Sequence, residues 1–278
     1  MSRLVGPVPD PAERASSALR RSPRATLSLE PAGPADRTAA PGAAGAAGAA
    51  RPTGATTAAV SLVHQVPDAG DLWVAVPAAE TAAIRYGGAH GRLEVLDVVV
   101  GGAADGRCRR VVVVEGRVEL PGVRTQRHTA AEIARDLPEP CLLDVGASVT
   151  LVRLRPDRVV LTDHDGVTEI ETEDLATSGP DPFADLEGHW LDHLNDPRCH
   201  VVPRMALRVC RCLPAERPLL VGIDRAGVDL EITGRDGRIH RQRLPFADDC
   251  TAVSELGAQI RLLAGGSRYP LDRAALRP

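Results

Sequence analysis

The sequence of 278 residues contains no lysine, so all 33 of its basic side chains are arginine. This absence excludes chemistry that needs a lysine amine, such as a Schiff base, a lysine nucleophile or the lysine of a phosphate-binding P-loop. Aromatic residues are also scarce, because the chain has only two Trp, two Tyr and two Phe. Sites for flavin, haem or nucleic-acid bases usually draw on stacked aromatic rings, so few residues are available to build one.

Neither acidic nor basic residues are in large excess. The formal net charge is -4 and the pI is about 6.1, so no strong field attracts phosphate backbones or acidic membranes. We therefore expect no nucleic-acid partner. No run approaches the ~18 apolar residues of a membrane span, and the first ten residues lack the apolar segment of a secretory signal. These absences predict a cytoplasmic protein without a membrane contact.

Motifs of serine hydrolases and zinc sites are missing. The sequence has no G-x-S-x-G nucleophile elbow, which argues against serine hydrolase chemistry. No two cysteines have C-x-x-C spacing, and Cys210 and Cys212 are too close together and too isolated for a zinc knuckle. We expect reduced, buried thiols. The six cysteines are Cys108, Cys141, Cys199, Cys210, Cys212 and Cys250.

Residues 1–30 are predicted to form an N-terminal helix and strand. The helix spans 10–21, with Asp10 at the N-cap, Pro11 at the first helical position and Glu13 three residues after the cap. Residues 31–55 are so rich in Ala, Gly and Pro, without apolar periodicity, that they cannot offset the entropy of ordering. We interpret them as a linker.

Residues 56–178 carry short runs rich in Val and Leu, separated by turn residues, which predict β-strands. A single predicted helix, 128–137, interrupts them, and the pattern indicates a small barrel. The segment Asp163-His164-Asp165 is rich in ionisable groups, but the Gly166 that follows favours a hairpin tip. The predicted strands are 58–66, 71–77, 92–100, 109–120, 149–155 and 158–163.

The sequence GPDPF at 179–183 predicts the boundary of a second domain, 181–266, followed by a tail, 267–278. Apolar residues at helical spacing predict its helices, and alternation predicts three strands, 219–223, 228–232 and 239–246. The residues expected on the inner faces of the helices are Leu186, Trp190 and Leu194, then Ala206, Val209, Cys210 and Leu213, and finally Val253, Leu256, Ile260 and Leu263.

Three patterns in this second domain, HWLDHLN, GIDRAGVDL and RLPF, appear in an order that resembles a known family. They are similar to the small C-terminal domain of unknown function in the haem-utilisation proteins. In that family the domain follows a split barrel like that of pyridoxamine 5'-phosphate oxidase, an FMN-binding fold. The matching residues are Trp190, His193, Leu194, Asn195, Gly222, Asp224, Gly227, Arg243, Leu244 and Phe246.

The resemblance implies an α+β protein, a split β-barrel followed by a small α/β domain with helices packed on a three-stranded antiparallel meander. It also implies haem or tetrapyrrole handling, either by a binding protein or by a weak haem-degrading oxygenase. In such proteins a histidine holds the iron and arginines hold the propionates. Among the candidate residues, His193 and His240 are the expected ligands, with Arg204, Arg208 and Arg225 as partners of the carboxylates.

Departures from the family pattern leave two other functions open. Where family members carry a second histidine after H-[LM]-N, this chain has Pro197 and Arg198, and no histidine follows His240. An FMN-dependent oxidoreductase is one alternative, and a non-catalytic regulator that binds another protein is the second. Whether the protein is an enzyme stays open.

Four successive valines, 111–114, offer apolar side chains to both faces of one predicted strand. One small barrel core cannot hide both faces. Because split barrels are expected to pair across an exposed sheet face, we predict a homodimer.

Overall fold

The computed structural model describes residues 8–21, 24–31, 56–66, 70–84, 89–99, 102–210, 217–234 and 237–265. The predicted linker, apart from Pro31, and the predicted tail lie outside the described residues. The chain divides into two compact units. Unit 1 comprises Met1–Ser17, Asp97–Arg109 and Pro180–Pro278, and unit 2 comprises Ala18–Leu96 and Arg110–Gly179.

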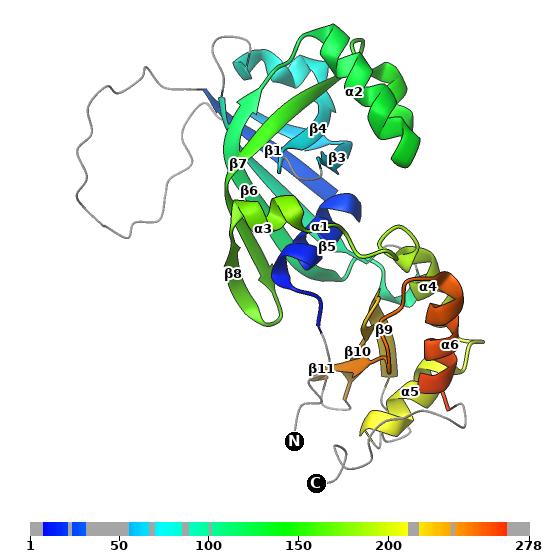
Figure 1. The fold of residues 1–278 in the computed structure, drawn as a ribbon. Helices are drawn as coiled ribbons and strands as arrows, with labels where there is room; N and C mark the ends of the chain where they lie inside the picture. Colours follow the sequence, from blue (N-terminus) through cyan, green and yellow to red (C-terminus); the bar gives the residue numbers. More distant parts are fainter. Residues whose placement is uncertain are drawn as a thin grey trace, which may run out of the picture. The chain divides into compact units, whose positions relative to one another are not determined.

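Unit 2 is built on a curled antiparallel half-barrel sheet, which is shown in Figure 1. Its strands lie in the order β2-β1-β5-β6-β7-β4-β3, and β8 pairs with β7. Together with the meander of unit 1, this sheet confirms the predicted α+β class. The strands are β1 Arg24–Pro31, β2 Thr56–Val60, β3 Leu62–Gln65, β4 Leu72–Pro77, β5 Ala89–Val98, β6 Cys108–Glu119, β7 Val149–Asp163 and β8 Gly166–Ile170.

Strand β7 joins two predicted strands, 149–155 and 158–163, into one of 15 residues. Between the two predicted runs lies Pro156, which cannot donate a ladder hydrogen bond. The structure accommodates this proline at a β-bulge opposite Gly116 of β6, where the register shifts. A Cβ at Gly116 would lie 1.9 Å from the Arg155 carbonyl oxygen, so only glycine fits there.

The tip of the β7–β8 hairpin is formed by the ionisable segment at 163–166, as predicted. Asp163 pairs with Gly166 in the antiparallel register, and Gly166 has a φ of 129°, which favours glycine. The Asp165 backbone N–H donates to Asp163 Oδ1 at 2.9 Å. Strand β8 itself was missed, because only Ile170 of its residues is buried.

Helix α2, Val123–Asp136, begins five residues before the predicted start, and its apolar face packs on the sheet of unit 2. Shorter helical segments of this unit are η1 Ala78–Ile84, η3 Pro140–Asp144 and α3 Thr172–Thr177. The cluster beneath α2 consists of Leu62, Ala75, Ala130, Ile133, Leu142, Val145 and Leu151.

Helix α1, Pro11–Arg21, begins as its sequence predicts. The Glu13 backbone N–H donates to the side-chain Oδ1 of Asp10 at 2.7 Å, which confirms Asp10 as the N-cap. The boundary between the units falls within α1 and also within β5 and β6, so these three elements contribute residues to both units.

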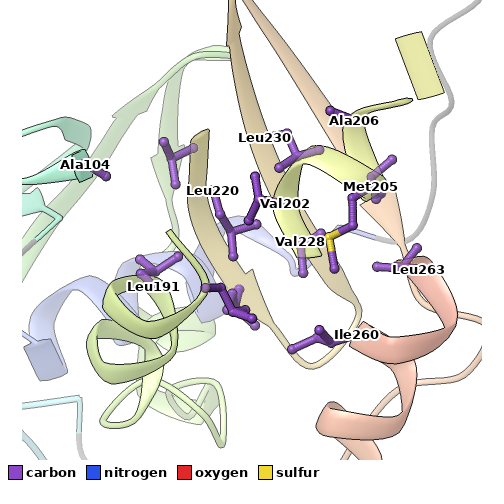
Figure 2. Close-up of a cluster of buried hydrophobic side chains, with 14 of the residues drawn as sticks. Ala104, Leu191, Val202, Met205, Ala206, Leu220, Val228, Leu230, Ile260 and Leu263 are labelled. Carbon is purple, nitrogen blue, oxygen red and sulfur yellow. The ribbon is translucent and has the colours of Figure 1, made fainter. Parts of the chain in front are cut away.

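Unit 1 contains the predicted three-stranded antiparallel meander in the order β11-β10-β9. Figure 2 shows apolar side chains of its strands and helices pointing towards one another in one buried cluster. The elements are β9 Arg217–Asp224, β10 Gly227–Thr233, β11 Ile239–Pro245, α4 Glu187–Leu194, α5 Val201–Cys210, α6 Val253–Leu263 and the short η2 Gly102–Ala104.

Two residues predicted to lie inside this cluster do not. Leu186 is 40% exposed and Val253 is 46% exposed, because each stands at the start of its helix, before the buried face begins. Leu191 and Leu194 are buried on α4, and Leu256, Ile260 and Leu263 are buried on α6. Trp190 is only partly buried at the edge of the cluster.

The described cysteines form no disulfide, in agreement with the predicted reduced thiols. The expectation of buried thiols is confirmed for Cys250 alone among these four, because Cys141 and Cys199 are partly exposed and Cys108, at the start of β6, is exposed. The side chains of Cys210 and Cys212 lie outside the described residues. Among the helices that the structure describes, none has the length and apolar character needed to cross a membrane.

Two neighbouring positions on α5 test the packing of unit 1. Met205 is fully buried in the cluster, whereas Leu207 is 60% exposed. We expect Met205→Ala to lower the free energy of unfolding by about 2–5 kcal/mol, through lost burial and the cavity left behind. Leu207→Ala should change it by no more than about 0.5 kcal/mol. Urea denaturation measures both, and equal effects would contradict the packing described.

Candidate functional site

A buried arginine joins three segments of unit 1 that are distant in sequence. The side chain of Arg109 is 8% exposed and donates to Asp97 Oδ1 at 2.8 Å. It also donates to both carboxylate oxygens of Glu187, at 2.5 and 3.0 Å, and to the carbonyl oxygen of Val221 at 3.0 Å. Glu187 Oε1 accepts a further hydrogen bond from the Ile223 N–H at 2.9 Å. The group ties the 97–109 segment to α4 and β9.

The protonation of this group is fixed by its two anions. Burial alone would lower the pKa of the Arg109 guanidinium, but the charges of Asp97 and Glu187 raise it above its ordinary value. Arg109 therefore stays charged at neutral pH. Glu187 is the first residue of α4, where the helix dipole also favours a carboxylate. The arrangement is structural, since every charge in it faces an opposite one.

Loss of Arg109 should leave two buried carboxylates uncompensated. We expect Arg109→Met to lower the free energy of unfolding by about 3–5 kcal/mol. The matched control is Arg92→Met on β5, because Arg92 pairs with Glu115 at 2.6 Å but is 49% exposed. That exposed pair should contribute at most about 1 kcal/mol. Chemical denaturation of both variants measures the difference, and a comparable small loss in each would contradict the role assigned to Arg109.

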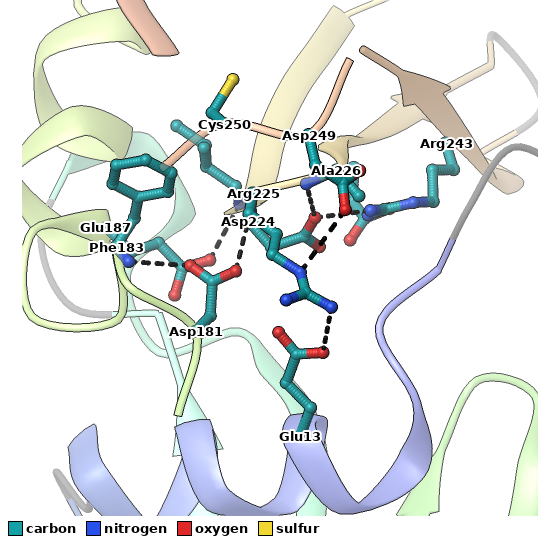
Figure 3. Close-up of polar contacts among 12 residues, drawn as sticks. Glu13, Asp181, Phe183, Glu187, Asp224, Arg225, Ala226, Arg243, Asp249 and Cys250 are labelled. Atoms are coloured by element: carbon teal, nitrogen blue, oxygen red, sulfur yellow. Dashed lines mark hydrogen bonds and ion pairs between the residues drawn. The ribbon is translucent and has the colours of Figure 1, made fainter. Parts of the chain in front are cut away.

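A second polar group surrounds Arg225, one of the predicted partners of the propionates (Figure 3). The Arg225 backbone N–H donates to Asp181 Oδ2 at 2.7 Å, and its Nη2 donates to Glu13 Oε2 at 3.0 Å. Asp249 lies 3.8 Å from the Arg225 Nε. The guanidinium predicted to receive an external carboxylate is therefore held by carboxylates of this chain.

Asp181 organises the segment before α4. Its side chain accepts the Phe183 N–H at 2.8 Å, in addition to the Arg225 N–H, and its own N–H donates to the Ser17 hydroxyl at 2.8 Å. Burial raises the pKa of Asp181, although these two backbone hydrogen bonds oppose the shift. Burial likewise raises the pKa of Glu13, and the charge of Arg225 opposes it.

The raised pKa of Glu13 predicts the direction of a pH effect on stability. The folded state binds this proton more tightly than the unfolded state, so wild type should gain stability relative to Glu13→Gln as pH falls from neutrality. The gain is complete below the ordinary value of 4.5. Thermal melting of both proteins from pH 7 to pH 4 measures it.

Glu255 provides a control of opposite sign. It is exposed, and hydrogen bonds from the backbone of Thr251 and Ala252 lower its pKa. Wild type should therefore be favoured over Glu255→Gln above pH 4.5 and should lose that advantage as pH falls through the lowered pKa. The same sign for both substitutions would contradict the account of Glu13.

Residues of the family-like patterns bind one another. Arg243 Nη2 donates to Asp224 Oδ1 at 2.6 Å, and Nη1 donates to Asp229 at 3.2 Å. Asp224 also caps the turn between β9 and β10 by accepting the Ala226 N–H at 2.9 Å. Gly227 is not among the glycines with positive φ. Glycine is needed there because a Cβ would lie 2.5 Å from the Leu244 carbonyl oxygen.

Asn195, another residue of these patterns, also has a structural role. Its side-chain amide donates to the Leu220 carbonyl at 2.8 Å, and its Oδ1 accepts the Leu220 N–H at 2.9 Å. These two bonds fasten the end of α4 to β9. The asparagine of HWLDHLN therefore supports the fold of unit 1.

The five predicted haem-binding residues occupy separate elements of unit 1. His193 is exposed on α4, His240 is exposed on β11, and Arg204 is exposed on α5. The side chain of Arg208 lies outside the described residues, and Arg225 belongs to the carboxylate group above. Within the described part of the chain, no hydrogen bond or ion pair joins any two of His193, His240, Arg204 and Arg225. Their role as a haem site stays a prediction.

One histidine that the sequence did not single out has a different environment. His64 on β3 is half-buried, whereas the other seven histidines, all within the described residues, are exposed. Burial lowers the pKa of the His64 imidazole, the charge of Arg20 lowers it further, and Asp136 opposes the shift. His64 pairs in register with Trp73 of β4, and Trp73 pairs with Arg153 of β7. Trp73 and Arg153 lie on strands that are not consecutive in sequence, so no local pattern could reveal the whole row.

Comparisons with known proteins support the fold. The chain is similar in structure to a haem-binding protein from Mycobacterium smegmatis, with a TM-score of 0.52 and 18% identity, over 93% of this chain and 98% of that one. A protein of unknown function from Agrobacterium tumefaciens aligns over 94% of this chain and 99% of that one, at 15% identity and a TM-score of 0.33. The first likeness shows a split-barrel-like α+β fold.

No family model matches the sequence. No curated protein matches it either.

Proposed function

We propose that this protein binds haem or a closely related tetrapyrrole. The observation that carries the proposal is the likeness of nearly the whole chain to a haem-binding protein. The sequence patterns resemble those of haem-utilisation proteins, which have this architecture of a split barrel followed by a helix-and-meander domain. Because a fold hosts many functions, side chains must supply the remaining support.

The described residues fit the chemical needs of haem. Iron takes a neutral imidazole as ligand, and the propionates take arginine. The chain has eight histidines and 33 arginines, and a partly buried tryptophan in each unit, Trp73 and Trp190. When bound, haem would supply an iron centre with ligand-binding and redox chemistry. The protein would supply the axial ligand, the apolar surface and the cations.

A homodimer is part of the same proposal. On β6, Val112 and Val114 are fully buried, while Val111 and Val113 are half-buried on the opposite face. Val113 pairs with the half-buried Val160 of β7, so the apolar surface continues onto the next strand. A second copy of the chain would cover this face.

Titration of the full-length protein with haemin tests the function. We expect a shifted Soret band that saturates at one haem per chain, because one ligand and one set of cations define one site. Addition of a reductant in the presence of O2 then distinguishes a binding protein, in which the band persists, from a haem-degrading oxygenase, in which it decays. Absence of any Soret change at equimolar haem would overturn the proposal. Flavin absorption in the purified protein would favour the FMN-dependent alternative.

A further inference from the structure

The half-buried histidine of unit 2 has the properties of an iron ligand. We infer that His64, on the face of β3 and β4 that carries Trp73, is the imidazole that holds the haem iron. This inference rests on the proposed function and assigns the ligand to a position other than His193 and His240.

The first support is the face of the sheet on which His64 lies. Side chains alternate along a strand, so His64 shares a face with Leu62, and Trp73 shares it with Ala75. Leu62 and Ala75 belong to the cluster under α2, and Trp73 packs against that cluster. Trp73 therefore offers an aromatic surface beside the imidazole, of the kind on which a porphyrin packs.

The second support is the state of the imidazole. Within the described residues, neither ring nitrogen of His64 takes part in a hydrogen bond or ion pair. The groups around it are Arg20 of α1, Asp136 of α2 and the neutral Trp73 of β4. Burial and Arg20 together outweigh Asp136 and keep the pKa of His64 below its ordinary value of 6.5. The lowered pKa favours the neutral ring, whose nitrogen lone pair is available to a metal.

The third support is the charge that flanks the row. Arg153 lies opposite Trp73 on β7, and its Nε donates to Asp71 Oδ2 at 2.8 Å, which orients the guanidinium. Arg20 donates to the Asp136 carbonyl oxygen at 3.1 Å, and its charge acts on His64. The Arg153 guanidinium is ion-paired with Asp71 and 33% exposed, so a solvent-accessible cation lies beside Trp73, where a carboxylate of the ligand can approach it.

The exposed histidines lack this combination. His193 and His240 are solvated. A solvated histidine can bind iron, but it provides little of the burial that gives haem its affinity.

Haemin titrations of matched histidine variants test the assignment. We expect His64→Gln to weaken haem binding by more than about tenfold, since even supporting contacts of a metal ligand contribute that much. His90→Gln, an exposed position on β5, and His193→Gln should bind like wild type. Added imidazole should restore the wild-type Soret spectrum to His64→Ala, because it replaces the missing ligand. The spectrum of wild type should also persist as pH falls below 6.5, where an ordinary histidine is protonated.

The outcomes separate this inference from the proposed function. No Soret change in wild type would overturn haem binding itself. Normal binding and spectrum in both His64 variants, with loss in His193→Gln or a His240→Gln variant, would overturn His64 as ligand and leave haem binding intact.

If the His64 variants do not fold, chemical modification of the wild-type protein tests whether His64 is the iron ligand. Diethyl pyrocarbonate should modify His64 in the free protein, and bound haem should protect His64 while the exposed histidines still react. Mass spectrometry of the digested protein measures the modification of each histidine. Equal modification of His64 with and without haem would overturn the inference.

Discussion

The charge of Arg109 is the constraint on which the rest of unit 1 depends. It is surrounded by Asp97 and Glu187, which are themselves almost fully buried, and by the carbonyl oxygen of Val221. Removal of ions from water is costly, so the group is stable only while every member is in place. Glu187 can accept from Arg109 and from the Ile223 N–H only if α4 starts beside β9. The interaction thereby fixes where α4 begins, and the apolar cluster of Figure 2 is built around that placement.

Most of the residues that match the patterns of the haem-utilisation family have structural roles in unit 1. Asn195 fastens α4 to β9, Asp224 and Arg243 pair across the meander, and Gly227 allows β10 and β11 to approach. Patterns that identify the fold are therefore poor guides to a cofactor site in this chain. The iron ligand that we propose lies instead on the sheet of unit 2, where His64 pairs with Trp73, and no motif includes either residue.

Local patterns in the sequence were enough to predict most elements, because alternation and helical spacing are properties of short segments. The cap at Asp10 and the hairpin tip before Gly166 were predicted for the same reason. Errors arose at helix starts, as at Leu186 and Val253, where the apolar pattern extends past the buried face. Contacts between distant segments could not be predicted. Arg109 and Glu187 are 78 positions apart, and the row of His64, Trp73 and Arg153 requires the pairing of β3, β4 and β7.

The two tryptophans provide the most direct measurement of where a tetrapyrrole binds. Trp73 lies beside His64 in unit 2, and Trp190 lies on the same helix as His193 in unit 1. Each indole N–H gives its own resonance in the NMR spectrum of ¹⁵N-labelled protein. A diamagnetic haem analogue, gallium protoporphyrin, shifts nearby protons through its ring current. The account predicts that the Trp73 resonance moves on addition of the analogue while that of Trp190 stays in place. Movement of Trp190 alone, or of neither, would contradict it.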